Sequence, residues 1–344
     1  MNVTEGGFKD RQLHIEDYLQ MVSAEQKEYA EVSAHQRIAE NNYIITDFQT
    51  DKLMEKILSN DNLNQAYKKV KSNKGAGGVD GMNVDELLSF LRDNGTQLKQ
   101  QLMIGKYKPN PVRRVEIPKE TKDEIRKLGI PTVVDRVFQQ AITQVLSPIY
   151  EEQFSESSFG FRPCRGAHDA LKQCQTNVND GYVYVVDMDL EKFFDTVCQS
   201  KLIEVLSRTI KDGRVISLIH KYLNAGIISR GVFERTEIGM PQGGPLSPLL
   251  SNIMLNELDK ELTCRGHRFV RYADDCMIFC KSRKSAERTL ENITPVIERK
   301  LYLKVNREKT GVAHISKVKY LGYSFYNYRG KCRFRVHPKS VTKM

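Results

Sequence analysis

The chain has 344 residues, of which 53 are Lys or Arg and 43 are Asp or Glu, so its formal net charge is +10. This length allows a substantial core and about two or three subdomains, and the charge suits a polyanionic partner. No apolar run approaches the roughly 18 residues of a membrane helix. The seven cysteines are scattered without a Cys-x-x-Cys motif, which predicts reduced thiols and no zinc site. We therefore expect a cytoplasmic protein without a membrane partner.

The N-terminal part of the chain is expected to be mostly helical. Residues 1–50 are polar with sparse apolar positions, which favours one or two helices, and helical periods continue over 53–70. The glycine loop 75–81 lacks the Gly-Lys-Ser/Thr ending of a Walker loop. Basic residues gather over 68–122, where Tyr107 is a candidate either for stacking on a base or for ordinary packing.

Two strands and a helix come next. Val112–Ile117 and Arg126–Ile130 are expected to form a hairpin, and Asp135 is expected to begin a helix with a broad apolar face. The later elements are expected to be helices at 201–211, 214–224 and 284–301, and strands within Val232–Ile238 that return to the hairpin. The helix at 284–301 contains Pro295, which should disrupt it.

A buried strand then leads into acidic residues. Tyr182–Val186 is a β-branched and aromatic run of the kind that fills such a strand. It continues into Asp187 and Asp189, which share one face of the strand because side chains alternate with period two. Spacing alone leaves open which of the two carboxylates serves a metal site.

The most informative feature is a second pair of carboxylates at a hairpin tip. Asp274 and Asp275 lie between the apolar runs Phe269–Arg271 and Cys276–Cys280. Repulsion between adjacent carboxylates is relieved when divalent cations bind their oxygens, and two such ions would form a phosphoryl-transfer site. A solvated turn is the alternative. Cys276 and Cys280 share a strand face and are expected in the core.

A glycine-rich loop, Gly239–Gly244, lies between the two acidic strands and opens a helix. Ser247 is the expected N-cap and Pro248 the first helical residue, and apolar residues follow at helical spacing up to Leu262. Adjacent glycines let the backbone approach a ligand closely. We expect this loop to contact a base pair or a phosphate rather than to be a plain turn.

In their order along the chain, these motifs resemble those of reverse transcriptases, and more narrowly the reverse transcriptases (maturases) encoded by bacterial group II introns. The resemblance covers roughly residues 50–330, and the sequence around the glycine loop resembles retron or diversity-generating enzymes less. It implies an α+β fold, a right-hand polymerase fingers and palm with a central antiparallel sheet backed by helices. The motifs are Arg113–Lys119, Leu128–Thr132, Phe159–Pro163, Asp189–Asp195, Pro241–Gly243, Tyr272–Asp275 and Tyr320–Gly322.

The same resemblance implies a subdomain organisation. The thumb (maturase) and endonuclease regions of family members are expected to be absent. The implied parts are an N-terminal helical extension at 1–50, fingers at 51–130 with 196–240 packing back on them, and a palm at 131–195 and 241–344.

It also implies the site residues. Asp189, Asp274 and Asp275 would be catalytic and, with Leu190, would hold two Mg²⁺ ions for which Mn²⁺ can substitute. Asp189 is preferred over Asp187 because it lies five residues before the aromatic that would exclude a ribose 2′-hydroxyl, whereas Phe193 is expected in the core. The implied nucleotide-binding residues are Lys119, Arg126, Phe194, Gln242 and Lys309. The implied template and primer contacts are Arg113, Arg114, Arg162, Gly243, Tyr320, Leu321 and Gly322.

The implied function is RNA-directed DNA polymerisation that copies intron RNA into cDNA for retromobility, with binding of the intron RNA that assists splicing. The implied partners are intron RNA, an RNA template with a DNA primer, and deoxynucleoside triphosphates. The alternative is an RNA-binding splicing scaffold with little polymerase activity.

Overall fold

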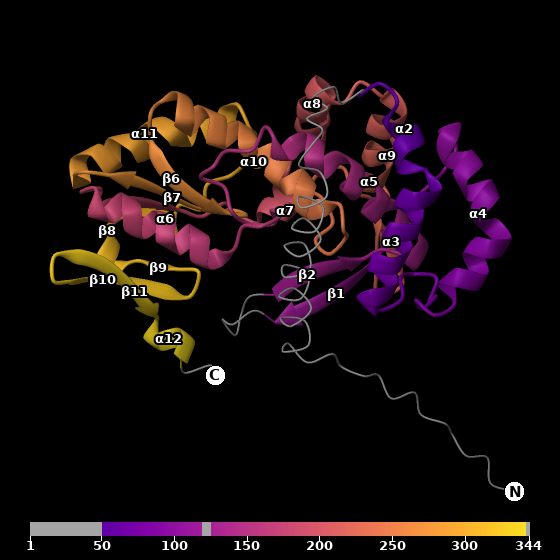
Figure 1. Ribbon diagram of the computed structural model, residues 1–344, viewed down its shortest axis with the longest axis horizontal. Coiled ribbons are helices and arrows are strands. Elements are labelled where there is room, and N and C mark those ends of the chain that lie inside the picture. The colour runs from indigo at the N-terminus through magenta and orange to yellow at the C-terminus, as the bar shows by residue number, and fades with distance from the viewer. Residues whose placement is uncertain (1–49, 119–124, 342–344) are drawn as a thin grey trace, which may run out of the picture. The chain divides into compact units, whose positions relative to one another are not determined.

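The computed structural model describes residues 50–118 and 125–341 (Figure 1). The described residues up to Phe161, and again from Arg165, belong to one compact unit, whereas Arg162–Cys164 fall in a second unit. The helices expected within residues 1–50 lie outside the described part, apart from Thr50, and so does Lys119.

Helices occupy most of the positions that the sequence predicts. The two expected after residue 200 are observed as α8 and α9, each beginning one or two residues earlier. The helices are α2 (Leu53–Ile57), α3 (Asn60–Ser72), α4 (Leu87–Met103), α5 (Val133–Glu151), α6 (Ala167–Asn179), α7 (Phe193–Thr196), α8 (Gln199–Thr209), α9 (Gly213–Leu223), α10 (Ser247–Cys264), α11 (Arg283–Arg299), the 3₁₀ turn η1 (Ile315–Lys317) and α12 (Pro338–Val341).

The strands form three sheets, with orders β2-β1-β4-β5, β6-β7-β3-β8 and β11-β10-β9. We name the first the fingers sheet and the second the palm sheet. The strands are β1 (Val112–Pro118), β2 (Ile125–Ile130), β3 (Tyr184–Met188), β4 (Ile227–Ser229), β5 (Val232–Glu234), β6 (Arg268–Tyr272), β7 (Asp275–Cys280), β8 (Gly311–His314), β9 (Lys319–Tyr320), β10 (Tyr323–Tyr328) and β11 (Lys331–Val336).

The fingers sheet is completed by a segment from later in the chain. β1 and β2 form the expected antiparallel hairpin, and β4 pairs parallel to β1 through Val112 and Ile227. β4 and β5 are joined by Arg230 and Gly231, whose positive φ angles of 50° and 82° are those of a two-residue type I′ turn. The return expected near Val232 is therefore present, although it begins earlier than expected.

The palm sheet is antiparallel throughout and has a core on each face. One core includes buried residues of α10 and α11, and the other includes residues of α6 and of the three-stranded sheet. Figure 1 shows α11 and α6 on opposite sides of β6 and β7. The expected central antiparallel sheet backed by helices is thus confirmed.

Side chains of β7 alternate between the two cores. Cys276, Ile278 and Cys280 belong to the first, and Met277 and Phe279 belong to the second. A strand buried on both faces appears in sequence as a continuous apolar run, as here. Cys276 and Cys280 therefore lie in the core, as their spacing predicts, with 1% and 4% of their surface exposed.

Two local predictions are corrected, and one open alternative is decided. The helix expected to begin at Asp135 begins at Val133, because the Thr132 side chain caps it by accepting from the Asp135 backbone N–H at 3.2 Å. α11 runs unbroken through Pro295, where the flanking side chains are buried. Tyr107 is 5% exposed and its hydroxyl donates to Asp135 at 2.8 Å, so its ring packs in the core instead of being offered to a base.

Among the helices of the described residues, none is both long enough and apolar enough to cross a bilayer.

Candidate active site

Two adjacent carboxylates lie at the turn between β6 and β7. Tyr272 pairs with Asp275 across the hairpin, so Ala273 and Asp274 form a two-residue loop. Ala273 has a φ of +56° and is the only one of the two with positive φ, the sign pattern of a type II′ turn. A residue other than glycine is strained there. The hairpin geometry therefore holds Asp274 and Asp275 at its tip against a local conformational cost.

The other two carboxylates lie at the end of β3, beside the start of β7. Asp187 is in the strand, and Asp189 lies just beyond it. The Asp189 backbone is fixed by its N–H, which donates to the Thr310 hydroxyl at 3.1 Å, and by its carbonyl, which accepts from the Asn306 N–H at 3.0 Å. Since β3 and β7 are antiparallel neighbours, this end of β3 lies next to Asp275.

The four carboxylates interact electrostatically. Burial, and then Asp189, raise the pKa of Asp187 to about 6. Burial raises the pKa of Asp275 to about 7, with Asp274, Asp187 and Asp189 adding to the effect, although the Asp275 side chain keeps contact with solvent. Burial also raises the pKa of Asp274, and Asp189 adds to it. Asp189 adds to the rise in pKa at each of the other three carboxylates; its role as the central ligand in preference to Asp187 stays a prediction.

The donor chemistry of this cluster fits a hard divalent cation, because carboxylate oxygens are the preferred ligands of Mg²⁺. The side chain of Leu190 is apolar and 7% exposed, so only its main-chain oxygen could be a ligand. Within residues 50–118 and 125–341, no three acidic, histidine or cysteine side chains are assembled as a metal site. The fit of this cluster to a divalent cation therefore rests on its carboxylate chemistry and on the electrostatic interaction between the carboxylates. It does not rest on ligands already gathered around one point.

Positive charge faces this cluster from the fingers sheet. Arg126 is exposed on β2, and its charge opposes the rise in the pKa of Asp274, so it lies within electrostatic reach of the β6–β7 turn. Lys309 is exposed and directly precedes Thr310, which holds Asp189. The structure therefore brings Arg126 and the backbone at Lys309 to the carboxylates.

The expected sugar-pocket aromatic lies on α7, near the glycine-rich loop. Phe193 is 2% exposed and belongs to the core, whereas Phe194 is half-buried. The rings meet edge to face with centroids 5.3 Å apart. The Met240 N–H donates to the Phe194 carbonyl at 2.7 Å, and a Cβ on Gly239 would lie 2.8 Å from the same oxygen. The assignment of Phe193 to the core is confirmed, and Phe194 is next to the loop.

The glycine-rich loop is joined to the fingers sheet. The Gly129 N–H of β2 donates to the Gln242 carbonyl at 2.7 Å, and a Cβ on Gly243 would lie 2.7 Å from the Gly129 oxygen. Ser247 is the first helical residue and not the expected N-cap, because its hydroxyl donates to the Pro241 carbonyl at 2.5 Å and closes the loop. Gln242 and Gly243 are thus fixed against β2.

A charged network that sequence reasoning missed supports the β6–β7 turn. Arg271 is completely buried. Its Nε and Nη2 donate to Asp259 at 2.8 and 2.5 Å, and its Nη2 also donates to Ser158 at 2.8 Å. Its Nη1 donates to the Ala273 carbonyl at 2.8 Å and to Asn252 at 3.0 Å. A buried guanidinium with this many partners fixes the strained turn to α10.

The same network reaches the segment before α6. The Asn252 amide donates to the Gly160 carbonyl at 2.8 Å. A Cβ on Gly160 would lie 2.3 Å from the Ala273 nitrogen and 2.9 Å from the Tyr272 carbonyl carbon, so Gly160 permits a backbone contact that no other residue allows. A charged residue between apolar ones, in a strand buried on both faces, was the sequence signal that could have identified Arg271.

The expected template contacts in the fingers sheet have internal partners. Arg113 donates to the Gly77 carbonyl at 2.9 and 3.1 Å, which ties β1 to the glycine loop 75–81. Arg114 pairs with Glu234 of β5 at 2.8 Å. Arg162 belongs to the separate unit, so its position relative to the site is not described. Contact of these arginines with a template stays a prediction.

The expected primer contacts form a tight hairpin. Leu321 and Gly322 have φ angles of +49° and +84° and make a type I′ turn between Tyr320 and Tyr323. Tyr320 is 3% exposed, and its hydroxyl donates to the Asp275 and Val270 carbonyls, both at 3.4 Å. Its ring therefore packs under the β6–β7 hairpin, and a primer contact at this turn stays a prediction for Leu321 and Gly322.

Comparison with known proteins agrees with this arrangement. Residues 117–325 match the family model described as reverse transcriptase (RNA-dependent DNA polymerase). Protein YkfC of Escherichia coli (strain K12) is 35% identical over 78% of this chain and 79% of its own length. The group II intron-encoded protein LtrA of Lactococcus lactis subsp. cremoris is 31% identical over 84% of this chain, which spans 59% of LtrA.

A solved structure, the partial Cas6-RT-Cas1--Cas2 complex, is 24% identical, with a TM-score of 0.46, over 76% of this chain and 46% of that chain. The family match confirms the expected fingers-and-palm fold and the expected reverse transcriptase resemblance. The chain belongs to the reverse transcriptase (RNA-dependent DNA polymerase) family.

Proposed function

We propose that this chain adds deoxynucleotides to a DNA primer on an RNA template, and that the template is a group II intron RNA. The observation that carries the proposal is the coupling of Asp189 to Asp274 and Asp275 at neighbouring strand ends, with Arg126 in electrostatic reach. Phosphoryl transfer depends mainly on positioning and charge stabilisation. Concentrated negative charge opposite a cation is the arrangement that this chemistry needs.

Members of this family generally use divalent metals, and Mg²⁺, with Mn²⁺ as a substitute, is the ion that we propose. Asp189, Asp274, Asp275 and the main-chain oxygen of Leu190 would hold it. Two bound ions would lower the pKa of the primer hydroxyl and neutralise charge on the leaving pyrophosphate.

The chain's own residues do the positioning. The bonds from Thr310 and Asn306 fix Asp189. Arg126 would offset the negative charge of a bound triphosphate. Phe194 stands beside the glycine-rich loop, where an aromatic would crowd a ribose 2′-hydroxyl. Gln242, whose loop is tied to β2, would line the nascent base pair.

We also propose that the chain binds its intron RNA, assists splicing and copies the RNA for retromobility in a bacterial cytoplasm. The similarity to LtrA supports the intron partner, and the net charge of +10 suits a polyanion. The seven cysteines are all free, which suits a reducing compartment.

Single-nucleotide extension of a DNA primer on an RNA template tests the proposal. Asp274→Asn should abolish addition while leaving RNA affinity within about threefold, because it removes a ligand charge without adding bulk. Asp93→Asn, an exposed acid on α4, is the matched control and should extend normally. Binding of Mn²⁺, followed by its electron paramagnetic resonance signal, should weaken only in the first variant.

Extension by Asp274→Asn at the wild-type rate would refute the site. Absence of extension by the wild-type chain, with tight RNA binding retained, would favour the RNA-binding scaffold.

A further inference from the structure

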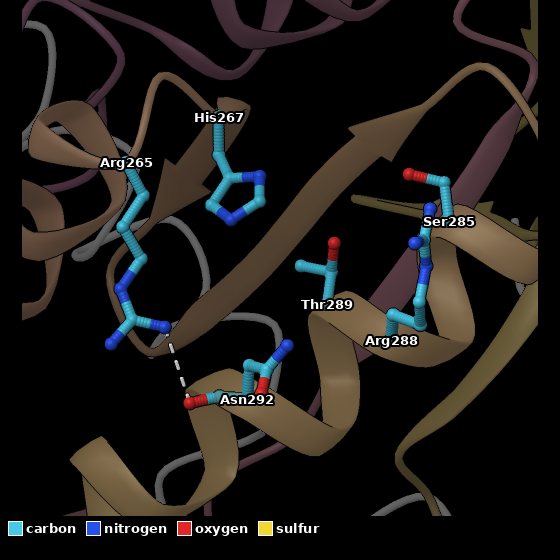
Figure 2. Close-up of a pocket in the computed structure, with 6 residues that line it drawn as sticks. All are labelled: Arg265, His267, Ser285, Arg288, Thr289 and Asn292. Atoms are coloured by element: carbon cyan, nitrogen blue, oxygen red, sulfur yellow. Dashed lines mark hydrogen bonds between the residues drawn. The ribbon is translucent and has the colours of Figure 1, made fainter.

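An open pocket of about 280 Å³ lies at the other end of the palm sheet (Figure 2). We name it the α11 pocket. β6 runs from Arg268, next to the pocket, to Tyr272 at the catalytic turn, a length of about 15 Å at the usual strand rise. The pocket is therefore separate from the polymerase centre. Its lining residues are Arg265, His267, Ser285, Arg288, Thr289 and Asn292.

The lining is unusual because every side chain can donate a hydrogen bond and none is a carboxylate. Figure 2 shows Arg265 and His267 on one side and the α11 side chains on the other. Arg265 is held by Glu261 at 2.7 and 2.8 Å and by the Asn292 carbonyl at 3.2 Å. In the described parts of the chain Arg288 has no carboxylate partner. A pocket in which every lining side chain can donate and none is a carboxylate is suited to an anion.

The charges around the pocket also favour an anion. Burial, and then the charge of Arg265, lower the pKa of His267. The first turn of α11 contains no acidic residue but does contain Arg283 and Lys284, although the positive end of the helix dipole favours negative groups. Arg283 pairs with Glu287; Lys284 has no carboxylate partner among the residues with described positions. A bound anion would relieve this concentration of cations.

The cations that extend from the pocket are those of α11. Arg268 and Lys281 lie over the ring of Tyr182, at 4.6 and 5.3 Å from its centroid, and Tyr182 packs against the core on the α6 side of the sheet, so these two cations are on the face away from the pocket. Lys284 and Arg288 lie one helical turn apart on α11. Two cations spaced along a helix suit a chain of phosphates, whose charges repeat along the strand.

We infer that the α11 pocket binds a backbone phosphate of RNA, and that this end of the palm is an RNA-docking surface separate from the polymerase site. The inference rests on the proposed function only in taking RNA as the polyanion. Docking here would hold a structured RNA while the primer terminus occupies the catalytic end of the same sheet.

The test uses a fluorescein-labelled RNA stem-loop and the salt dependence of its affinity, followed by fluorescence anisotropy. Arg288→Gln should weaken binding by up to about fivefold, as one partly exposed charge contact does. It should also reduce the slope of log K against log[salt] by about 1, as loss of one phosphate contact does. His267→Gln, inside the pocket, tests whether more than one lining residue contributes.

Arg299→Gln is the matched control, because it removes the same charge from the same helix about 16 Å further along. It should leave the slope unchanged. Equal losses in Arg288→Gln and Arg299→Gln would overturn the inference, and polyglutamate that competes as well as unlabelled RNA would overturn its assignment to nucleic acid. Both variants should extend a short annealed primer normally, so failure here is distinguishable from failure of the proposed polymerase, which the Asp274→Asn experiment decides.

Discussion

Replacing Gly160 with alanine should disable nucleotide addition without removing any chemical group. The added Cβ would lie 2.3 Å from the Ala273 nitrogen, about 1 Å inside ordinary van der Waals contact. The obstacle is backbone on both sides, since Gly160 is held by Asn252 and Ala273 by Arg271. The turn that carries Asp274 must therefore shift.

The size of the effect follows from that distance. A misplacement of about 1 Å at a reacting centre costs on the order of 10²-fold in rate, while overpacking a well-filled site costs about 1–3 kcal/mol of folding free energy. Because a domain of this size has more stability than that, the Gly160→Ala protein should fold and yet add nucleotides about a hundredfold more slowly.

The assay is single-nucleotide extension under single-turnover conditions, with thermal unfolding measured on the same samples. Gly95→Ala is the control, because a Cβ there meets nothing within 4 Å and the residue lies inside α4. This variant should keep full activity, and its free energy of unfolding should rise by about 0.8–1 kcal/mol. A Gly160→Ala protein that extends within about twofold of wild type would refute the idea that this contact positions the turn.

Three further predictions concern neighbouring residues. Arg271→Met should cost about 3–5 kcal/mol of folding free energy in urea denaturation, because it leaves Asp259 buried and unpaired; adding Asp259→Leu should recover part of this loss, and a double variant no more stable than the single one would contradict it. Phe194→Ala should increase ribonucleotide incorporation relative to deoxynucleotide, and an unchanged preference would remove Phe194 as the sugar gate. Without divalent metal, Asp275→Asn should stabilise the fold at pH 8 by about 1 kcal/mol after allowance for solvent screening. The folded pKa of Asp275, about 7, lies above the ordinary 3.8, so wild type loses stability as pH rises between these values; equal stability differences at pH 4 and pH 8 would count against this.

The palm strands could be predicted from the sequence because a buried strand appears as an apolar run of neighbouring residues. The apolar run of β7 and the spacing of Cys276 and Cys280 predict a buried strand, and the carboxylates at its end are read directly. Helix boundaries were less predictable: Ser247 has the features of an N-cap, but its hydroxyl bonds to Pro241 instead. That partner is set by how the loop folds back.

The network that supports the β6–β7 turn could not be predicted, because it depends on contacts between distant parts of the chain. In sequence, Arg271 is a charged residue that would ordinarily face solvent, and only the fold brings Ser158, Asn252 and Asp259 to it. Likewise, the sequence shows a glycine at 160 but not which backbone lies against it.

The parallel pairing of β1 with β4 has a consequence for how the protein is made. β3 of the palm lies between them in the chain, so the fingers sheet is incomplete on the ribosome until residue 234 has emerged. A fragment that ends at residue 130 would expose the unpaired edge of β1, which is a template for association with other chains. Fingers and palm should therefore fold after synthesis as one interdependent body, and neither should be obtainable alone by cutting the chain at a subdomain boundary.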